Sequence, residues 1–294
     1  KRAASMPKVH MNAIKGEKYK IGDLLYAMML ESYNDVAVAV AEGVAGSVEE
    51  FAKLMNKKAG EIGAVNTNFV TPNGLDAKGH FSTAYDMALI GAYAIKNQQF
   101  LKITNTKSYS FYDCSNKRHI VVNNKDAFLN MSSDAIGIKT GFTGDAGYCF
   151  VGAVKSNNRV YVSCVLASGW PPNKTYKWRD TTKLMDYGKN NFDTKKILKN
   201  RISFPVNIEN GTKKQIIAVA IGPYKALVSK NDTVEAKTEF NYELPIKSGE
   251  KIGEVKLYIN NQCVKKCKIE AVDSVEKYDF KYCFKKTLDY FIFQ

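Results

Sequence analysis

The spacing of apolar residues changes near residue 194, and this change limits the folds open to the chain. Before it, apolar residues recur at helical spacing in some stretches and in strand-like runs in others. After it, short β-branched runs such as TVEAKTEF are separated by Asn, Gly and Ser-Gly turns, which is typical of an all-β domain. A chain of 294 residues with 45% apolar content is long enough for two domains. We expect an α+β domain over residues 1–193, a small all-β domain over 194–275 and a tail over 276–294.

A helical apolar stripe near the start of the chain ends in a polar residue. The stripe has i, i+3, i+4, i+7, i+8 spacing and consists of Ile21, Leu24, Leu25, Met28 and Met29. The next position on the same face is Ser32. Asn34 follows and is predicted to cap a second helix, with Asp35 in its first turn.

Two more helices are predicted before residue 100. Ser47 and Glu50 have the spacing of a capping box, and Gly60 would end the helix that they start. A further helix is expected after Ser82.

The next segment reads as an antiparallel sheet. The runs GYCFVGAVK and RVYVSCVLASG flank Ser156, Asn157 and Asn158, which predicts a β-hairpin. The stretch 135–144, AIGIKTGFTG, is predicted to be a strand at the edge of that sheet. A helix containing Trp178, Leu184, Met185 and Tyr187 would pack back on the sheet.

The net charge and the numbers of cysteines and histidines give no indication of a cofactor. The net charge of +14 suits an anionic partner, but the lysines are scattered and no nucleic-acid-binding module is recognisable. Six cysteines without C-x-x-C spacing and three separated histidines argue against a metal site. We therefore expect no cofactor, no metal and no nucleic acid.

The tail has the pattern of an amphipathic helix. Its lysines alternate with an apolar set made of Phe280, Phe284, Leu288, Phe291 and Ile292. Contact with an anionic membrane surface and docking on the preceding domain are both open at this point.

Two short motifs occur together in the first domain: Ser32-Tyr33-Asn34 and Lys139-Thr140-Gly141. Class A β-lactamases and penicillin-binding proteins use the set S-x-x-K, S-D-N and K-T-G in their active sites. With the longer strings GDLLYAMMLESYNDVAVAVAE, DAIGIKTGFTGDAGYCFVGAVK and PIKSGEKIGEVKLYINN, the chain resembles the low-molecular-weight penicillin-binding proteins. These are serine-type D-alanyl-D-alanine carboxypeptidases, and the resemblance includes a C-terminal β domain like that of penicillin-binding protein 5.

The resemblance implies a fold and an activity. The first domain would be a penicillin-binding/β-lactamase-like transpeptidase domain, an antiparallel sheet with flanking helices. The substrate would be a peptidoglycan stem peptide, β-lactams would inhibit, and the enzyme would work outside the cytoplasm, with the tail as a possible membrane contact.

The resemblance also assigns roles to the motif residues. Ser32 would relay a proton towards the leaving nitrogen, and Asn34 would position the substrate amide. Lys139 would hold the hydroxyl network and the substrate carboxylate, helped by the Thr140 hydroxyl. Gly141 would let the substrate approach the strand, and the N–H of Phe142 would supply one oxyanion donor. Three other residues match family positions and are expected to be structural: Asp86, Arg179 and Asp180.

The nucleophile of the family lies in S-x-x-K, and only Ser5-Met6-Pro7-Lys8 has this spacing ahead of Ser32. No helical apolar stripe follows it, and Gly16 would end a helix early. We therefore expect Ser5 not to be the nucleophile and the chain to be an inactive, N-terminally truncated part of an active enzyme. A noncatalytic wall-binding protein on the same scaffold and a β-lactamase remain alternatives.

Overall fold

The computed structural model describes residues 2–292, and the chain divides after Asn190 into two compact units. Each unit has its own sheet and its own core of buried apolar side chains. The prediction of an α+β fold followed by an all-β region is confirmed.

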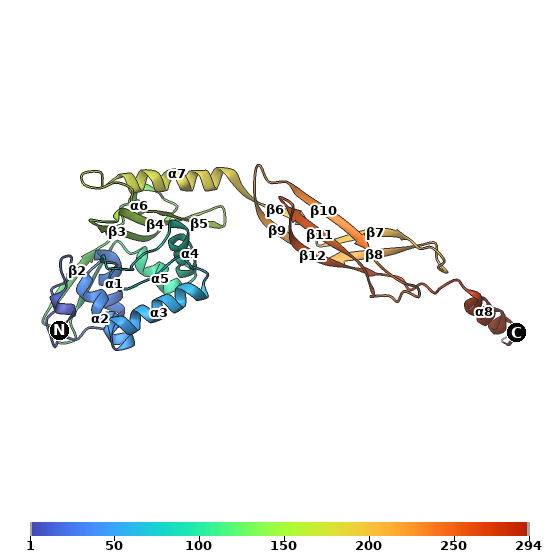
Figure 1. The fold of residues 1–294 in the computed structure, drawn as a ribbon, viewed down its shortest axis with the longest axis horizontal. Coiled ribbons are helices and arrows are strands. Elements are labelled where there is room, and N and C mark those ends of the chain that lie inside the picture. Colours follow the sequence, from blue (N-terminus) through green and yellow to red (C-terminus); the bar gives the residue numbers. More distant parts are fainter. Residues whose placement is uncertain (1, 293–294) are drawn as a thin grey trace. The chain divides into compact units, whose positions relative to one another are not determined.

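The first unit is built on an antiparallel sheet with the strand order β3-β4-β5 (Figure 1). The strands are β3 (Ala135–Thr143), β4 (Gly147–Ser156) and β5 (Arg159–Val165). The β4–β5 hairpin turns at Asn157 and Asn158, both with positive φ, as predicted. The strand β3 is at the edge of the sheet, which was also predicted.

Helices cover both faces of this sheet. The helix α7 (Tyr176–Asn191) buries Trp178 and Met185 against Phe150 and Val154. On the other face, α4 (Ala84–Ala94) and α5 (Gln98–Thr104) pack on a core cluster containing Val151. The prediction that Leu184 and Tyr187 pack on the sheet was wrong, because both side chains are exposed.

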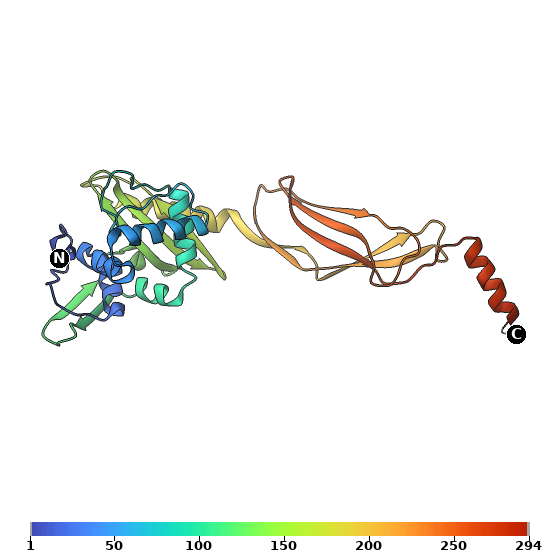
Figure 2. The same ribbon diagram turned by 60° about the horizontal axis from the view of Figure 1, so that its bottom comes forward.

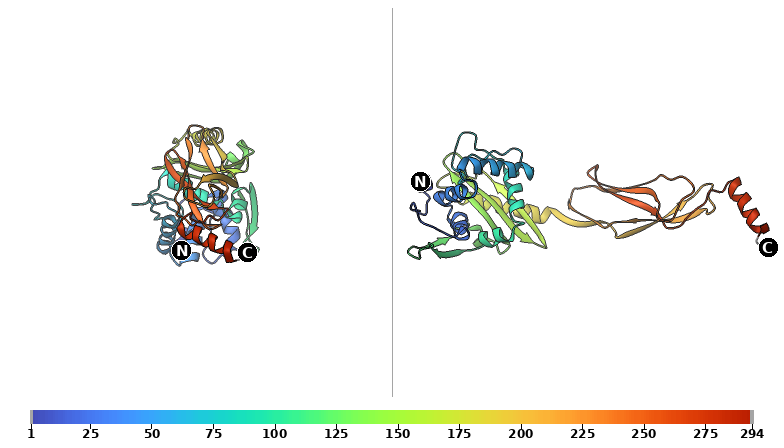
Figure 3. Two further views of the ribbon diagram at one scale, coloured as in Figure 1. Left: turned by 90° about the vertical axis from the view of Figure 1, so that its right-hand side faces the viewer. Right: turned by 90° about the horizontal axis from the view of Figure 1, so that it is seen from below.

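Seven further elements complete the described part of the first unit. They are a 3₁₀ turn, η1 (Ala3–Ser5), and α1 (Ile21–Glu31), α2 (Asn34–Ala45), α3 (Val48–Glu61), β1 (Ser108–Tyr112), β2 (His119–Asn123) and α6 (Phe128–Met131). The β1–β2 hairpin projects at the end of this unit where the N-terminal segment lies (Figures 2 and 3).

Three local predictions need correction. Asn34 is the first residue of α2 and not its cap, because the flanking residue is Tyr33 and no side chain caps the helix. The helix α3 runs past Gly60 to Glu61, and the chain turns at Gly63 with φ of 87°. Ile21 is 56% exposed, because α1 turns Ala27 and Leu30 into the core instead.

The second unit is all-β until its last helix. Its strands are β6 (Phe192–Leu198), β7 (Arg201–Asn207), β8 (Gln215–Ile221), β9 (Tyr224–Ser229), β10 (Val234–Phe240), β11 (Lys251–Ile259) and β12 (Gln262–Ala271). They form a sheet with the order β10-β11-β12-β8-β7 and a β6-β9 pair. Ile252, Leu257 and Ile269 are fully buried between them.

The last helix of the described residues is α8 (Phe280–Ile292), and none of its residues is buried. Its exposed side chains include Phe280, Phe284 and Phe291. Within residues 2–292, no helix combines the length and the apolar character needed to cross a bilayer.

Candidate active site

Ser32 and Lys139 meet between a helix end and a strand edge. Ser32 closes α1 in a left-handed conformation (φ 63°, ψ 38°), and its N–H donates to the carbonyl oxygen of Met28 at 3.1 Å. The Nζ of Lys139, on β3, donates to the Oγ of Ser32 and to the carbonyl oxygen of Thr140, the latter at 3.0 Å. The stripe of α1 therefore ends in a hydroxyl that is hydrogen-bonded to an ammonium group.

The strand that carries Lys139 is open along one side. Within residues 2–292, β3 pairs with β4 alone. Gly141 and Phe142 are exposed on it, and a Cβ on Gly141 would touch only the Cβ of Cys149, at 3.7 Å. Beyond them, the Oγ1 of Thr143 donates to Asp76 at 2.8 Å, which ties the strand to the loop that precedes α4. On this strand the carbonyl oxygens of Ile136 and Thr140 accept side-chain hydrogen bonds from Asn105 and Lys139. An unpaired strand edge of this kind is where an extended peptide can add as a further strand.

Asn34 lies two positions after Ser32 and is 6% exposed. Its Nδ2 donates to the carbonyl oxygen of Pro7 at 3.2 Å, and its backbone N–H donates to that of Val9 at 2.8 Å. The N-terminal segment therefore lies directly against the start of α2.

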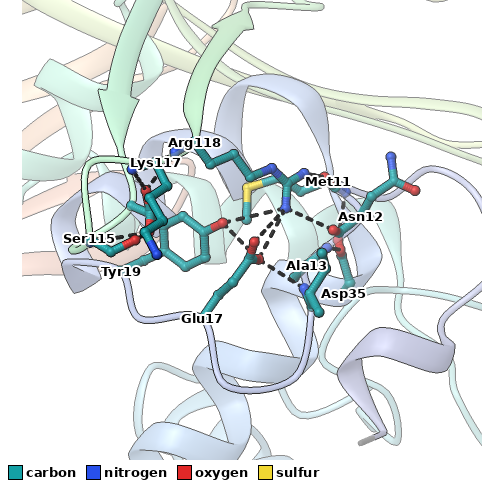
Figure 4. Close-up of polar contacts among 11 residues, drawn as sticks. Met11, Asn12, Ala13, Glu17, Tyr19, Asp35, Ser115, Lys117 and Arg118 are labelled. Carbon is teal, nitrogen blue, oxygen red and sulfur yellow. Dashed lines mark hydrogen bonds and ion pairs between the residues drawn. The ribbon is translucent and has the colours of Figure 1, made fainter.

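Asp35 fixes that segment through its carboxylate, which is 2% exposed. Its Oδ1 accepts from the N–H of Met11 at 2.9 Å, and its Oδ2 accepts from the N–H of Ala13 at 3.0 Å. Figure 4 shows this carboxylate against the backbone that carries Met11 and Ala13.

Arg118 holds the same segment from the β1–β2 hairpin (Figure 4). Its guanidinium donates to the carbonyl oxygens of Met11 and Asn12 and pairs with Glu17 at 3.0 Å. Burial acts to raise the pKa of Glu17, but hydrogen bonds from the N–H of Ile14, from Tyr19 and from Arg118 outweigh it and lower that pKa. Glu17 is therefore a firmly ionised anchor.

Lys139 titrates well below an ordinary lysine. Burial, opposed by the charge of Asp126 and aided by the nearby Lys177, lowers the pKa of Lys139 to about 8. Burial raises the pKa of Asp126 to about 6, although a hydrogen bond from Phe128 and the two lysines oppose that rise. The site thus holds an ammonium that releases its proton more readily than usual.

Sequence reasoning missed Asp126, Lys177 and Arg118. None belongs to a short motif or an apolar period, and each also interacts with residues that are far away in the sequence. Of the residues expected to be structural, Asp86 accepts from Asn66 and Thr67, and Asp180 pairs with Arg179 at 2.9 Å.

Ser5 lies in a different setting from Ser32. It ends the short turn η1, and its Oγ donates to the carbonyl oxygen of Arg2 at 2.9 Å. Both Ser5 and Lys8 are exposed. No cluster of three or more histidine, cysteine or carboxylate side chains suited to a metal ion occurs in the described part of the chain.

Known families match both units. Residues 2–169 match the family described as D-alanyl-D-alanine carboxypeptidase, and residues 192–277 match the one described as penicillin-binding protein 5, C-terminal domain.

Individual relatives extend the match across the chain. This chain is 30% identical over 292 residues to the D-alanyl-D-alanine carboxypeptidase DacF of Bacillus subtilis. The alignment covers 97% of this chain and 74% of that protein. The chain is 33% identical over 267 residues to the carboxypeptidase DacA of Haemophilus influenzae, covering 87% and 65%. The crystal structure of the carboxypeptidase DacD from Francisella tularensis matches with a TM-score of 0.73 and 23% identity, over 94% of this chain and 80% of that one, which supports the fold.

Proposed function

This chain belongs to the D-alanyl-D-alanine carboxypeptidase family, and from that membership we propose that its protein hydrolyses the terminal D-Ala-D-Ala bond of peptidoglycan stem peptides. The reaction would pass through a serine acyl-enzyme, which β-lactams would also form. The observation that carries the proposal is the hydrogen bond from the Lys139 Nζ to the Ser32 Oγ. It joins two motif residues 107 positions apart.

Ser32 and Lys139 would handle the proton of the leaving group. An ammonium with a pKa of about 8 can give up a proton near neutral pH, and the Ser32 hydroxyl can pass it to the leaving amine. While protonated, Lys139 also attracts the terminal carboxylate of the substrate.

The open edge of β3 would hold the substrate backbone. The peptide would pair with this strand beside Thr140 and Gly141, with its reacting carbonyl oxygen near the N–H of Phe142. The Thr140 hydroxyl would help to bind the carboxylate. Asn34 would position the substrate amide with the amide hydrogen that Pro7 does not occupy.

Ser5 would not be the nucleophile in this mechanism. Its hydroxyl is bound to a backbone carbonyl in an exposed three-residue turn, and no hydrogen bond links it to Lys8 in the described structure. A nucleophilic serine needs an adjacent base. We therefore expect this 294-residue chain not to be acylated by itself.

Labelling with a fluorescent penicillin tests these points. The full-length gene product should be labelled, a peptide ending in D-Ala-D-Ala should compete, and the same peptide ending in L-Ala-L-Ala should not. Lys139→Ala should slow acylation about 100-fold or more, whereas Lys155→Ala, at an exposed lysine of β4, should not.

Three results would redirect the proposal. Label on Ser5 of this chain would overturn the argument against that serine. Rapid turnover of penicillin by the full-length product would indicate a β-lactamase. No label and no hydrolysis in the full-length product would favour a noncatalytic wall-binding protein.

We also propose a membrane contact outside the cytoplasm: the location follows from the family, and the exposed rings of α8 support the contact. Phe280, Phe284 and Phe291 are 83%, 57% and 76% exposed, and Lys281, Lys285 and Lys286 lie between them in the sequence. The chain should sediment with vesicles that contain phosphatidylglycerol, and Phe284→Glu should release it. Equal sedimentation of both proteins would contradict a contact through α8.

A further inference from the structure

A histidine joins the two arms of the loop between α3 and α4. His80 is half-buried, and its Nδ1 accepts from the N–H of Val70 at 3.1 Å and from that of Thr71 at 3.3 Å. Its ring also packs edge-on against Phe69, with the ring centres 5.8 Å apart. The return arm of the loop therefore holds the outgoing arm through a ring nitrogen that must carry no proton.

The base of this loop is fixed to the rest of the first unit. Asn68 and Phe81 form a backbone bridge, with N–H to carbonyl distances of 2.9 and 3.0 Å. The side chain of Asn56, on α3, binds the N–H and the carbonyl oxygen of Phe69 at 2.6 and 2.9 Å. The stretch beyond these anchors, residues 70–80, is where the histidine contacts act.

The loop reaches the strand that carries the candidate site. The hydroxyl of Thr71 donates to the carbonyl oxygen of Leu75 at 2.8 Å, which closes a turn directly before Asp76. The carboxylate of Asp76 accepts from the Oγ1 of Thr143 at 2.8 Å, at the end of β3. Thr143 follows Phe142, whose N–H is the proposed oxyanion donor. Contacts thus run from the histidine through the loop to that donor.

A proton on Nδ1 would break this arrangement. The ring would then turn an N–H towards the amides of Val70 and Thr71, which need a lone pair. The Oγ1 of Thr71, 3.4 Å from Nδ1, could accept from the new N–H, but both amides would be left without their acceptor. Burial lowers the pKa of His80 below its ordinary value of 6.5, against the charge of Asp76, so the ring is neutral at pH 7 and charged in acid.

The surroundings of the ring contain little charge to stabilise its protonated form. Asp76 acts on it from the same loop, where Lys78 is exposed. The helix α4 contributes Asp86, whose buried carboxylate accepts two hydrogen bonds of 2.7 Å from residues 66–67. The helix α3 contributes the uncharged Asn56. Within residues 2–292 no carboxylate pairs with the ring, so its burial outweighs the attraction of the one on its loop.

We propose that His80 is a positioning residue for the reaction: its unprotonated Nδ1 keeps the loop in the conformation in which Asp76 holds Thr143 and thereby the end of β3. This inference rests on the proposed function. Protonation of His80 releases Val70 and Thr71, so the enzyme should lose activity in acid even while its reacting groups stay competent.

Nuclear magnetic resonance of this chain tests the contact without any need for activity. With ¹⁵N-labelled histidine, neutral His80 should carry its proton on Nε2 and titrate below pH 6.5. The amides of Val70 and Thr71 should lose protection from hydrogen exchange as the pH falls through that titration. His80→Asn, whose Oδ1 can accept in place of Nδ1 and does not titrate, should keep the protection. A neutral ring with its proton on Nδ1, or protection that does not follow the titration, would overturn the proposal.

Activity of the full-length gene product is the second readout. For a D-Ala-D-Ala peptide, kcat/KM of the wild type and of His80→Asn should agree above the titration of His80, and the wild type should be roughly 10–100-fold lower below it. His119→Asn, at an exposed ring on β2, is the matched control and should keep the wild-type profile. A ratio of wild type to His80→Asn that does not change with pH would contradict the positioning role.

A second variant tests the route through Asp76. In an Asp76→Ala background, His80→Asn should no longer rescue the loss in acid, because the loop then has no hold on Thr143. Rescue in that background would rule out this route. A wild-type product that hydrolyses nothing at any pH would refute the proposed function and with it the role of His80 in the reaction, while the exchange data would still decide whether His80 holds the loop.

Discussion

Gly91 on α4 lies so close to Val151 on β4 that a Cβ on the glycine would be 2.8 Å from the Cγ1 of the valine. The same atom would lie 3.2 Å from side-chain atoms of Ile138 and Val162. The absence of a side chain thus lets α4 pack directly on the sheet. Ile138 precedes Lys139 on β3, so the packing of α4 on the sheet also contacts the strand that carries the candidate site.

Replacing Gly91 should therefore destabilise the first unit. We expect Gly91→Ala to lower the free energy of unfolding by about 1–3 kcal/mol, because three side chains must move to admit one methyl group. Gly43→Ala is the matched control, since Gly43 is in helix α2 and a Cβ there meets nothing within 4 Å. It should stabilise the chain by up to about 1 kcal/mol. Urea denaturation measures both, and equal effects would contradict close packing at Gly91.

Lys139→Met should stabilise the fold while it removes the ammonium. A lysine whose pKa is lowered by burial from 10.5 to about 8 binds its proton less tightly in the folded chain than in the unfolded chain. This difference lowers the free energy of unfolding by its full amount below pH 8, and the effect disappears as the pH rises to 10.5. At pH 7 we expect the variant to have a higher melting temperature than the wild type, by roughly 2–4 °C for each 1 kcal/mol added to the free energy of unfolding. The difference in melting temperature should vanish above pH 10.5. Lys155→Met at an exposed position should change the melting temperature little at either pH.

Arg118→Ala should loosen the N-terminal segment. The change leaves the carbonyl oxygens of Met11 and Asn12 without their donor and Glu17 without its partner. We expect a loss of about 2 kcal/mol in the free energy of unfolding, with faster hydrogen exchange over residues 11–19. Arg179→Ala breaks an ion pair whose arginine is 53% exposed and should cost less than about 1 kcal/mol. Unaltered exchange in this segment would count against the network in Figure 4.

Ile269→Ala should affect the second unit alone. Its side chain is fully buried in a core cluster made only of residues 197–275, so the cavity should cost about 2–5 kcal/mol there. Both tryptophans of the chain, Trp170 and Trp178, belong to the first unit, so fluorescence reports the first unit while circular dichroism reports both. The circular dichroism transition should shift and the fluorescence transition should not. Ile217→Ala, at a side chain that is 42% exposed, is the control, and a shared shift would mean that the units unfold together.

The sequence was informative where one local pattern decides the structure. Two apolar runs joined by a Ser-Asn-Asn turn predicted the β4–β5 hairpin, and glycines around a short apolar run predicted the edge strand β3. The resemblance then paired Ser32 with Lys139, which no local spacing could do.

Predictions failed where neighbours decide. The Asn34 side chain is bound by Pro7, so it does not cap α2, and the close approach of the N-terminal segment cannot be read from the residues around Asn34. Asp126 has no signal in a short window, because the charges that act on its pKa, Lys139 and Lys177, belong to two other elements. The β1–β2 hairpin was missed as well, since its strands are only five residues each.

The open edge of β3 has a second consequence, in solution. An unpaired strand can template the strand of another molecule, so the opening that would admit a peptide also invites self-association during concentration or storage. Two residues oppose self-association at this edge. Lys139 carries a charge, and Gly141 has no side chain that could pack against a neighbouring strand. Replacing both with β-branched residues should make the open edge of β3 a site of aggregation.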